Sequence, residues 1–154
     1  MIKILKFPIL ITLFLLSPFF YAEGNHKLFN LGDFDLESGI TLPNAKLSYV
    51  THGKLNEERD NLIVVPSAYL GDHHGFDFLI EPGKALDPEK YFIVATDMFQ
   101  NGLSSSPSNT AAPYDGPNFP LISIRDNVKA GYKLVTRLPE LMELACRLAC
   151  EARD

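Results

Sequence analysis

The hydrophobic pattern changes twice along the chain. From His26 to Asn56 apolar and polar residues alternate, and FDLESG and AKLSYVTHG are predicted to be antiparallel strands joined through Gly39 and Pro43-Asn44. NLIVVPS (61–67) and KYFIVATD (90–97) are instead continuous apolar runs, which are typical of strands covered on both faces in a parallel sheet. This order of patterns predicts an α/β fold.

Two segments near the C-terminus have helical periodicity. In SIRDNVKAGYKLVTRL, Ser123 is a plausible N-cap, Asp126 occupies the capping-box position, and apolar residues recur at helical spacing. PELMELACRLACEARD is predicted to be a second amphipathic helix. The apolar positions are Ile124, Val128, Tyr132 and Val135 in the first segment and Leu141, Leu144, Ala145 and Leu148 in the second.

The connections between these elements are long. PSAYLGDHHGFD (66–77) follows the first apolar run and has little helical periodicity, and such loops are often functional. MFQNGLSSSPSNTAAPYDGPNFP (98–120) is rich in Ser, Asn, Gly and Pro, yet it also contains Met98, Phe99, Tyr114 and Phe119. Those residues favour an ordered loop packed on the domain over a flexible linker.

The N-terminus has the anatomy of a secretory signal peptide. Lys3 and Lys6 precede an apolar run from Phe7 to Tyr21, and Ala22 lies near a cleavage point. The run is shorter than the ~20 apolar residues of a membrane span. We therefore expect a signal peptide over residues 1–22 and export to the periplasm or the medium, with a membrane anchor as the alternative if the segment is not cleaved.

Composition and charge exclude some classes of function. The net charge is −5 with 21% charged residues and no basic cluster, which argues against nucleic acid as a partner. Cys146 and Cys150 lie on adjacent turns of the second predicted helix, where a disulfide or a zinc site is disfavoured. His73 and His74 point apart if their segment is extended, so we expect solvated loop histidines or a lid contact and no metal.

Several segments together resemble the homoserine O-acetyltransferase family of the α/β-hydrolase superfamily. They are FDLESGITLPNAKLSYVTHGKLN, PSAYLGDHHG, IEPGKALDPEKYFIVATDMFQNGLSSSPSN and FPLISIRDNVKAGYKLV. The resemblance runs from Phe34 to Val135. It implies the N-terminal portion of an α/β-hydrolase fold, in which an antiparallel hairpin is followed by parallel strands with helices.

The resemblance also implies acyl transfer or ester hydrolysis by a Ser-Asp-His triad, with backbone N–H groups that stabilise an oxyanion. One such N–H comes from the loop after the third strand, which is SAYLGD in this chain. The backbone of Tyr69 is the expected donor and that of Leu70 the alternative. Gly71 would let the backbone turn close to the substrate. A small acyl ester or acyl donor is the expected substrate, and no cofactor is expected.

The chain departs from the family pattern at several positions. Ser67 replaces the family's histidine at the start of the oxyanion loop, and Leu103 and Ser106 replace two glycines. These changes, together with export, favour an esterase or another acyl transfer over the use of acetyl-CoA and homoserine. No G-x-S-x-G occurs in the sequence, and the loop serines Ser104–Ser106 and Ser108 lack the glycines of a nucleophile elbow.

We therefore expect three segments: a signal peptide (1–22), the N-terminal part of an α/β-hydrolase domain (23–137) and a divergent helical tail (138–154). The leading hypothesis is a truncated esterase-like or acyltransferase-like protein that is inactive alone. The alternatives are one half of a split serine hydrolase, completed by another polypeptide, and an exported non-enzymatic binding module. A homodimer is a further possibility for the partner.

Overall fold

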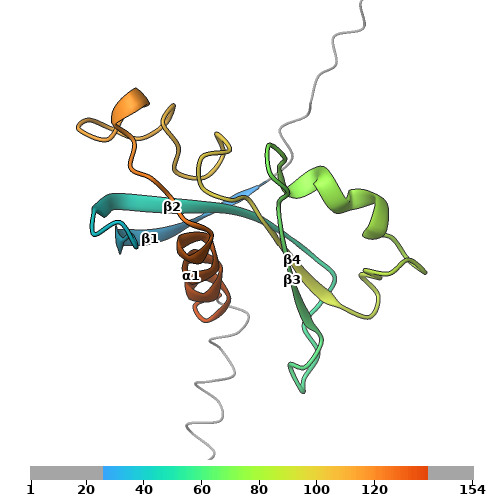
Figure 1. Ribbon diagram of the computed structural model, residues 1–154. Coiled ribbons are helices and arrows are strands. Elements are labelled where there is room, and N and C mark those ends of the chain that lie inside the picture. Colours follow the sequence, from blue (N-terminus) through green and yellow to red (C-terminus); the bar gives the residue numbers. More distant parts are fainter. Residues whose placement is uncertain (1–25, 139–154) are drawn as a thin grey trace, which may run out of the picture.

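The computed structural model describes residues 26–138, which form a twisted four-stranded sheet with one α-helix against it (Figure 1). The strands are β1 (Lys27–Asp35), β2 (Thr41–His52), β3 (Leu62–Pro66) and β4 (Phe92–Thr96), in the spatial order β1-β2-β4-β3. β1 and β2 are antiparallel, as are β2 and β4, whereas β3 and β4 are parallel. The predicted α/β arrangement, with a hairpin before the parallel strands, is confirmed.

The remaining described elements are two short 3₁₀ helices, η1 (His73–Leu79) and η2 (Gly116–Asn118), and the helix α1 (Ile124–Val135). Among residues 26–138 no helix is long and apolar enough to cross a membrane. The predicted signal peptide, the second amphipathic helix and both cysteines lie outside the described residues.

The first predicted strand was placed too late in the sequence. FDLESG was expected to be a strand, but β1 ends at Asp35 and the hairpin turn follows, closed by hydrogen bonds between Leu36 and Ile40 and between Gly39 and Leu36. Pro43-Asn44, expected in the connection, lie inside β2. The reason is a register shift on both sides of Gly32, which interrupts the two-residue alternation that would have revealed β1.

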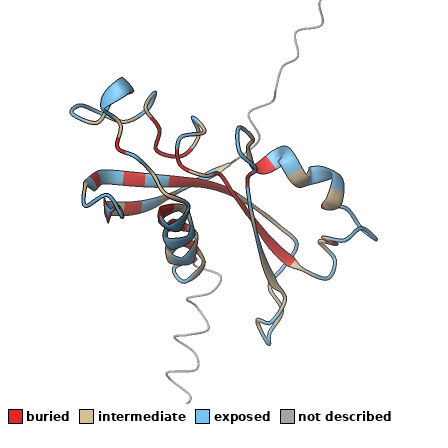
Figure 2. Cartoon of the chain, in the orientation of Figure 1, coloured by how far each residue is buried: buried red, intermediate tan, exposed pale blue. Residues whose placement is uncertain are grey.

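The two continuous apolar runs form β3 and β4, but only β4 is covered on both faces. All five residues of β4 are buried, as Figure 2 shows in red. β3 lies at the edge of the sheet formed by the described residues, and Val64 and Pro66 are exposed. Within residues 26–138 the prediction of a strand covered on both faces is therefore wrong for β3, because the face that carries Val64 and Pro66 stays open beside α1.

α1 begins with the capping box that the sequence predicts. Ser123 Oγ accepts the N–H of Asp126 at 3.1 Å, and the Asp126 carboxylate accepts the N–H of Ser123 at 2.9 Å. The other carboxylate oxygen accepts the N–H of Glu37 at 2.9 Å, which ties the helix to the β1–β2 turn. Burial opposes ionisation of Asp126, but these N–H groups outweigh it, so the pKa of Asp126 is lowered.

The core lies between the hairpin, β4 and α1, and the loop 98–120 closes one end of it. Ala130, Leu134 and Leu138 pack inward from α1 and its C-terminal end, and Phe99 packs from the loop. The loop is ordered and packed on the domain, as predicted. The apolar positions that recur along α1 in the sequence point the other way: Ile124, Val128 and Tyr132 are 80%, 67% and 68% exposed.

Candidate functional site

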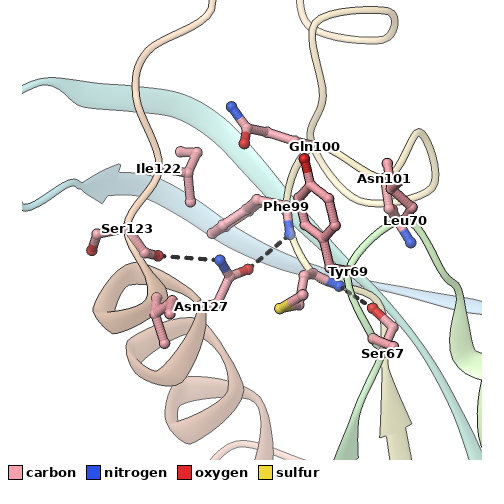
Figure 3. Close-up of a pocket in the computed structure, with 12 residues that line it drawn as sticks. Ser67, Tyr69, Leu70, Phe99, Gln100, Asn101, Ile122, Ser123 and Asn127 are labelled. Carbon is pink, nitrogen blue, oxygen red and sulfur yellow. Dashed lines mark hydrogen bonds between the residues drawn. The ribbon is translucent and has the colours of Figure 1, made fainter.

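The carboxyl ends of β3 and β4 open into one pocket. Because the two strands are parallel, the loops that follow them leave the sheet at the same edge, which is where α/β sheets usually bind ligands. The pocket has a volume of about 370 Å³ and is completed by the start of α1 (Figure 3). Its lining comes from residues 67–70 after β3, residues 98–101 after β4, and Ile122, Ser123, Ile124 and Asn127.

All three site residues predicted in the loop after β3 belong to one tight turn beside this pocket. The N–H of Gly71 donates to the carbonyl of Ala68 at 2.9 Å, and Leu70 has a φ of +61°. Tyr69 and Leu70 are the second and third residues of this four-residue turn. A positive φ at the third residue but not at the second is the pattern of a type II turn. The central N–H groups of such a turn are not used to close it.

Tyr69 and Leu70 line the pocket, and within residues 26–138 neither of their N–H groups has a protein acceptor. The turn therefore presents two free backbone donors at the carboxyl end of β3. The side chains of both residues are exposed, so the turn is positioned by its backbone and not by side-chain packing. Gly71 is the last residue of the turn, where a side chain would contact Ala68.

Hydrogen bonds fix the opposite wall of the pocket. Asn127 Oδ1 accepts the N–H of Phe99 at 2.8 Å, and its Nδ2 donates to the carbonyl of Ser123 at 3.2 Å. Ser67 Oγ accepts the N–H of Met98 at 3.1 Å, which joins the loop after β3 to the loop after β4. The three segments around the pocket are thus held together by polar side chains.

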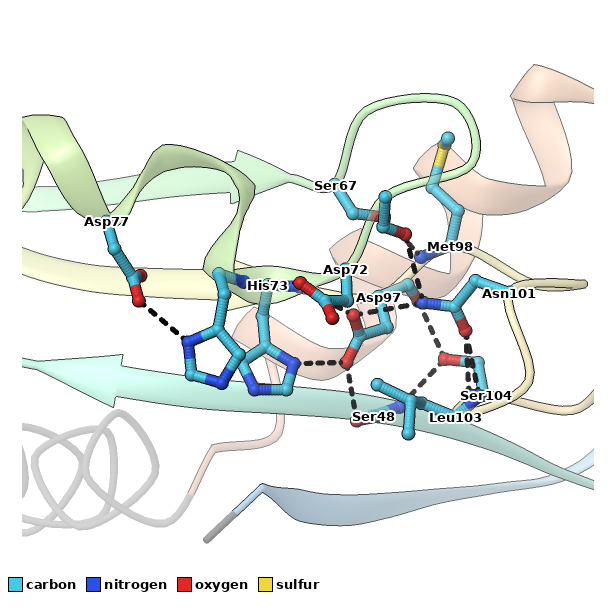
Figure 4. A network of polar contacts seen from close by, with 12 residues as sticks. Ser48, Ser67, Asp72, His73, Asp77, Asp97, Met98, Asn101, Leu103 and Ser104 are labelled. Carbon is cyan, nitrogen blue, oxygen red and sulfur yellow. Dashed lines mark hydrogen bonds and ion pairs between the residues drawn. The ribbon is translucent and has the colours of Figure 1, made fainter. Parts of the chain in front are cut away.

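A buried carboxylate anchors the far end of the loop after β3. Asp97, at the end of β4, is fully buried; it accepts the hydroxyl of Ser48 at 2.6 Å, and Asn101 Nδ2 donates to it at 3.0 Å (Figure 4). The backbone N–H of His73 donates to Oδ1 at 2.8 Å, while Nδ1 of the His73 ring lies 2.8 Å from Oδ2. The loop is therefore fixed to the sheet two residues beyond the turn.

The expectation that His73 is a solvated loop residue is wrong. Its side chain is 2% exposed, because Asp97 provides a buried partner for both its backbone and its ring. The arrangement also differs from a catalytic triad, since Ser48 bonds to the carboxylate and not to the imidazole.

His74 is half-exposed and pairs with Asp77 at 2.7 Å. Within residues 26–138 no group of three His, Cys, Asp or Glu side chains is arranged to hold a metal ion.

The buried serines of the loop after β4 have structural partners. Ser104 Oγ accepts the N–H of Ser48 at 2.9 Å and donates to the carbonyl of Asp97 at 2.7 Å. Ser105 Oγ accepts the N–H of Lys46 at 2.9 Å. These hydroxyls continue the hydrogen bonding of β2 beyond the end of β4, and none of these bonds involves a histidine.

Comparison with known proteins places this arrangement in a family. No family model matches the chain. Ethyl acetate hydrolase of Pseudomonas veronii is 39% identical over 130 residues, which are 82% of this chain and 37% of that protein. Homoserine O-acetyltransferase of Methanococcoides burtonii is 36% identical over 125 residues, which are 70% of this chain and 25% of that protein. The solved structure of the acetyl esterase MekB matches with a TM-score of 0.72 and 40% sequence identity. The match covers 74% of this chain and 33% of the MekB chain.

The strand order, the crossover from β3 to β4 and the helix α1 thus form the N-terminal part of an α/β-hydrolase fold. Within that superfamily, the chain belongs to the homoserine O-acetyltransferase family and matches its N-terminal part. Its relatives also include an ethyl acetate hydrolase and an acetyl esterase. The chain spans between a quarter and two fifths of the length of these relatives.

Proposed function

We propose that the chain supplies the oxyanion-binding side of an active site that hydrolyses or transfers short acyl groups. The observation that carries this proposal is the pair of free N–H groups at Tyr69 and Leu70, at the carboxyl end of β3 and beside a pocket. The names of the relatives, ethyl acetate hydrolase and homoserine O-acetyltransferase, support a small acyl ester as the substrate class.

The chemistry assigns a defined step to this chain. A serine hydroxyl attacks the ester carbonyl, its proton passes to a histidine, and the carbonyl oxygen becomes negatively charged. The N–H of Tyr69, or that of Leu70, donates to this oxygen and stabilises the charge. The bond to the alcohol then breaks, the histidine returns the proton to the leaving oxygen, and water or a second alcohol takes up the acyl group.

The printed sequence has no nucleophile elbow, and Ser104 and Ser105 are buried and bonded to the backbone. We infer that the chain alone does not turn over esters and that the serine, histidine and aspartate come from another polypeptide segment. Among acyl transfers we favour ester hydrolysis, because Ser67, Leu103 and Ser106 depart from the transferase pattern. The N-terminal pattern also supports export, and an exported protein would not meet cytoplasmic acetyl-CoA.

A chimera tests the assignment of Tyr69. In ethyl acetate hydrolase of Pseudomonas veronii, the segment that matches this chain is replaced by residues 26–138. We expect the chimera to hydrolyse p-nitrophenyl acetate and Tyr69→Pro to lower kcat by about 10²–10³-fold. Proline suits the second position of a type II turn, so this change removes the N–H and keeps the turn.

The control is the unfused chain, which should show neither turnover nor labelling by a fluorophosphonate. Labelling of Ser104 or Ser105 in the unfused chain would overturn the inference that the nucleophile lies elsewhere. An active chimera whose kcat is unchanged by Tyr69→Pro would overturn the role of that N–H.

A further inference from the structure

A buried histidine–aspartate pair lies at the end of β4, and the proposed chemistry does not use it (Figure 4). The side chains of His73 and Asp97 are 2% and 0% exposed, and Nδ1 of the ring lies 2.8 Å from the carboxylate. Within residues 26–138 the other ring nitrogen, Nε2, is buried without a hydrogen-bond partner. An unpaired buried polar atom is unfavourable, and an apolar side chain would fill the same space without one. Packing alone therefore does not account for an imidazole at this position.

Asp97 joins the two loops that form the pocket. Its Oδ1 accepts the backbone N–H of His73 at 2.8 Å and an N–H of Asn101 Nδ2 at 3.0 Å. Asn101 Nδ2 also donates to the carbonyl of Gly71, the last residue of the turn, at 3.4 Å. Because the amide nitrogen carries two hydrogens, Asn101 makes both bonds at once. The carboxylate thus holds the end of the turn directly through His73 and indirectly through Asn101.

The start of the turn is tied to the same stretch of chain. Ser67 donates its N–H to the carbonyl of Thr96 at 2.8 Å, and its Oγ accepts the N–H of Met98 at 3.1 Å. Thr96 and Met98 are the sequence neighbours of Asp97. In the part of the chain that the structure describes, the polar contacts that fix the turn from its two sides therefore all reach residues 96–101.

The turn has little of its own to hold it in shape. Leu70 adopts a φ of +61°, which is unfavourable for residues other than glycine. The side chains of Tyr69 and Leu70 are 86% and 91% exposed, so packing does not compensate. The direction of the two free N–H groups therefore depends on the contacts at the two ends of the turn.

We propose that His73 and Asp97 are positioning residues, which hold the two free N–H groups of the turn in the direction needed to bind an oxyanion. The proposal rests on the proposed function and adds to it the residues that orient the same site. Neither side chain lines the pocket, so both act through the backbone of the turn. Oxyanion stabilisation requires donors that are held in place before the reaction, and a misplacement of about 1 Å costs about 10²-fold in rate.

The test uses the chimera described above and compares two neighbouring histidines. His73→Leu fills the buried space but removes the donor to Asp97. It should lower kcat for p-nitrophenyl acetate by about 10–100-fold and change KM by less than about twofold, because the charge on the carbonyl oxygen arises only in the transition state. His74→Leu is the matched control and should leave kcat unchanged, since the carboxylate partner of His74 is Asp77, which lies in η1 and not in the sheet.

His73→Asn separates positioning from packing. The side-chain amide of asparagine places a donor close to where histidine has Nδ1, so this variant keeps a bond to Asp97 and loses the rest of the ring. If His73 positions the turn, kcat should be higher for His73→Asn than for His73→Leu. A merely structural role gives the opposite order, because leucine fills the space and asparagine leaves a cavity.

A second measurement does not depend on ester chemistry. In the product of the full 154-residue sequence, the amide heteronuclear NOE values of Tyr69 and Leu70 should match those of β4. They should fall in His73→Leu and stay unchanged in His74→Leu. Unchanged values in His73→Leu would overturn the positioning role, whatever the activity of the chimera.

The outcomes separate this proposal from the proposed function. If Tyr69→Pro lowers kcat and His73→Leu does not, the positioning role is overturned and the proposed function stands. If His73→Leu disorders the turn while Tyr69→Pro leaves kcat unchanged, the hold of the pair on the turn stands and the proposed function is overturned. Equal losses of kcat in His73→Leu and His74→Leu would also overturn the positioning role.

Discussion

Asp126 is 2% exposed, yet its surroundings favour the charged form. Burial raises its pKa, but the N–H groups of Ser123 and Glu37 lower it by more, so the net shift is downward from its ordinary value of 3.8. A carboxyl whose pKa is depressed by folding stabilises the folded state above its unfolded pKa. That stabilisation is lost as the pH falls through the lower folded pKa, which places its effect below about pH 4.

Asp126→Asn should therefore lower the free energy of unfolding at pH 7 by about 1–2 kcal/mol, since the charge-assisted bonds at the helix cap are weakened. The loss should shrink as the pH is lowered from 5 to 2. Urea denaturation followed by circular dichroism at several pH values measures both effects. Asp115→Asn is the control, because Asp115 is exposed and makes no side-chain cap bond. An equal loss at pH 7 and pH 2 would contradict the assignment of the shift to Asp126.

Individual residues of the site were predictable only in part. The position of Tyr69 after an apolar run, together with the family resemblance, was enough to single out the turn beside the pocket, and its role toward an oxyanion stays a prediction. The hydrogen bonds that hold it were not predictable, because Asp97 meets His73 and Ser48 across 24 and 49 residues of sequence. The one local signal was a carboxylate directly after the run FIVAT, in which every residue but Thr96 is apolar, and such a position favours a buried, paired aspartate.

Secondary-structure elements were predicted with unequal success. The cap of α1 is a local pattern, and the capping box at Ser123 and Asp126 is confirmed. The face of α1 that packs on the sheet was harder to predict, since Ala130 and Leu134 pack inward while the more frequent apolar residues point outward. A stripe of apolar residues says that a face is covered, but not by which part of the molecule.

The two faces of α1 should respond differently to truncation. Leu134→Ala removes a fully buried side chain and should lower the free energy of unfolding by about 2–5 kcal/mol. Val128→Ala removes a side chain that is 67% exposed and should change it by less than about 0.5 kcal/mol. Both values follow from urea denaturation of the full chain. Similar losses for the two variants would mean that the outer face of α1 is already covered in the isolated chain.

The strands of the sheet follow from the order of patterns along the sequence, but which strand lies at an edge does not. NLIVV and FIVAT look alike as runs, and both predict an interior strand, yet β4 is interior and β3 is an edge. The difference depends on what lies beside each strand, which a local run does not contain. Among residues 26–138 the two runs differ in their neighbours, since β4 pairs with β2 and β3 whereas β3 pairs with β4 alone.

Amide hydrogen exchange across the molecule tests this distinction directly. Each amide of β4 lies between β2 and β3, and the strand is fully buried, so the residues Phe92–Thr96 should exchange most slowly. The amides of Leu62 and Val64 point to the free edge and should exchange at rates close to those of exposed loops. Slow exchange at Leu62 and Val64 would contradict the assignment of β3 as an edge strand.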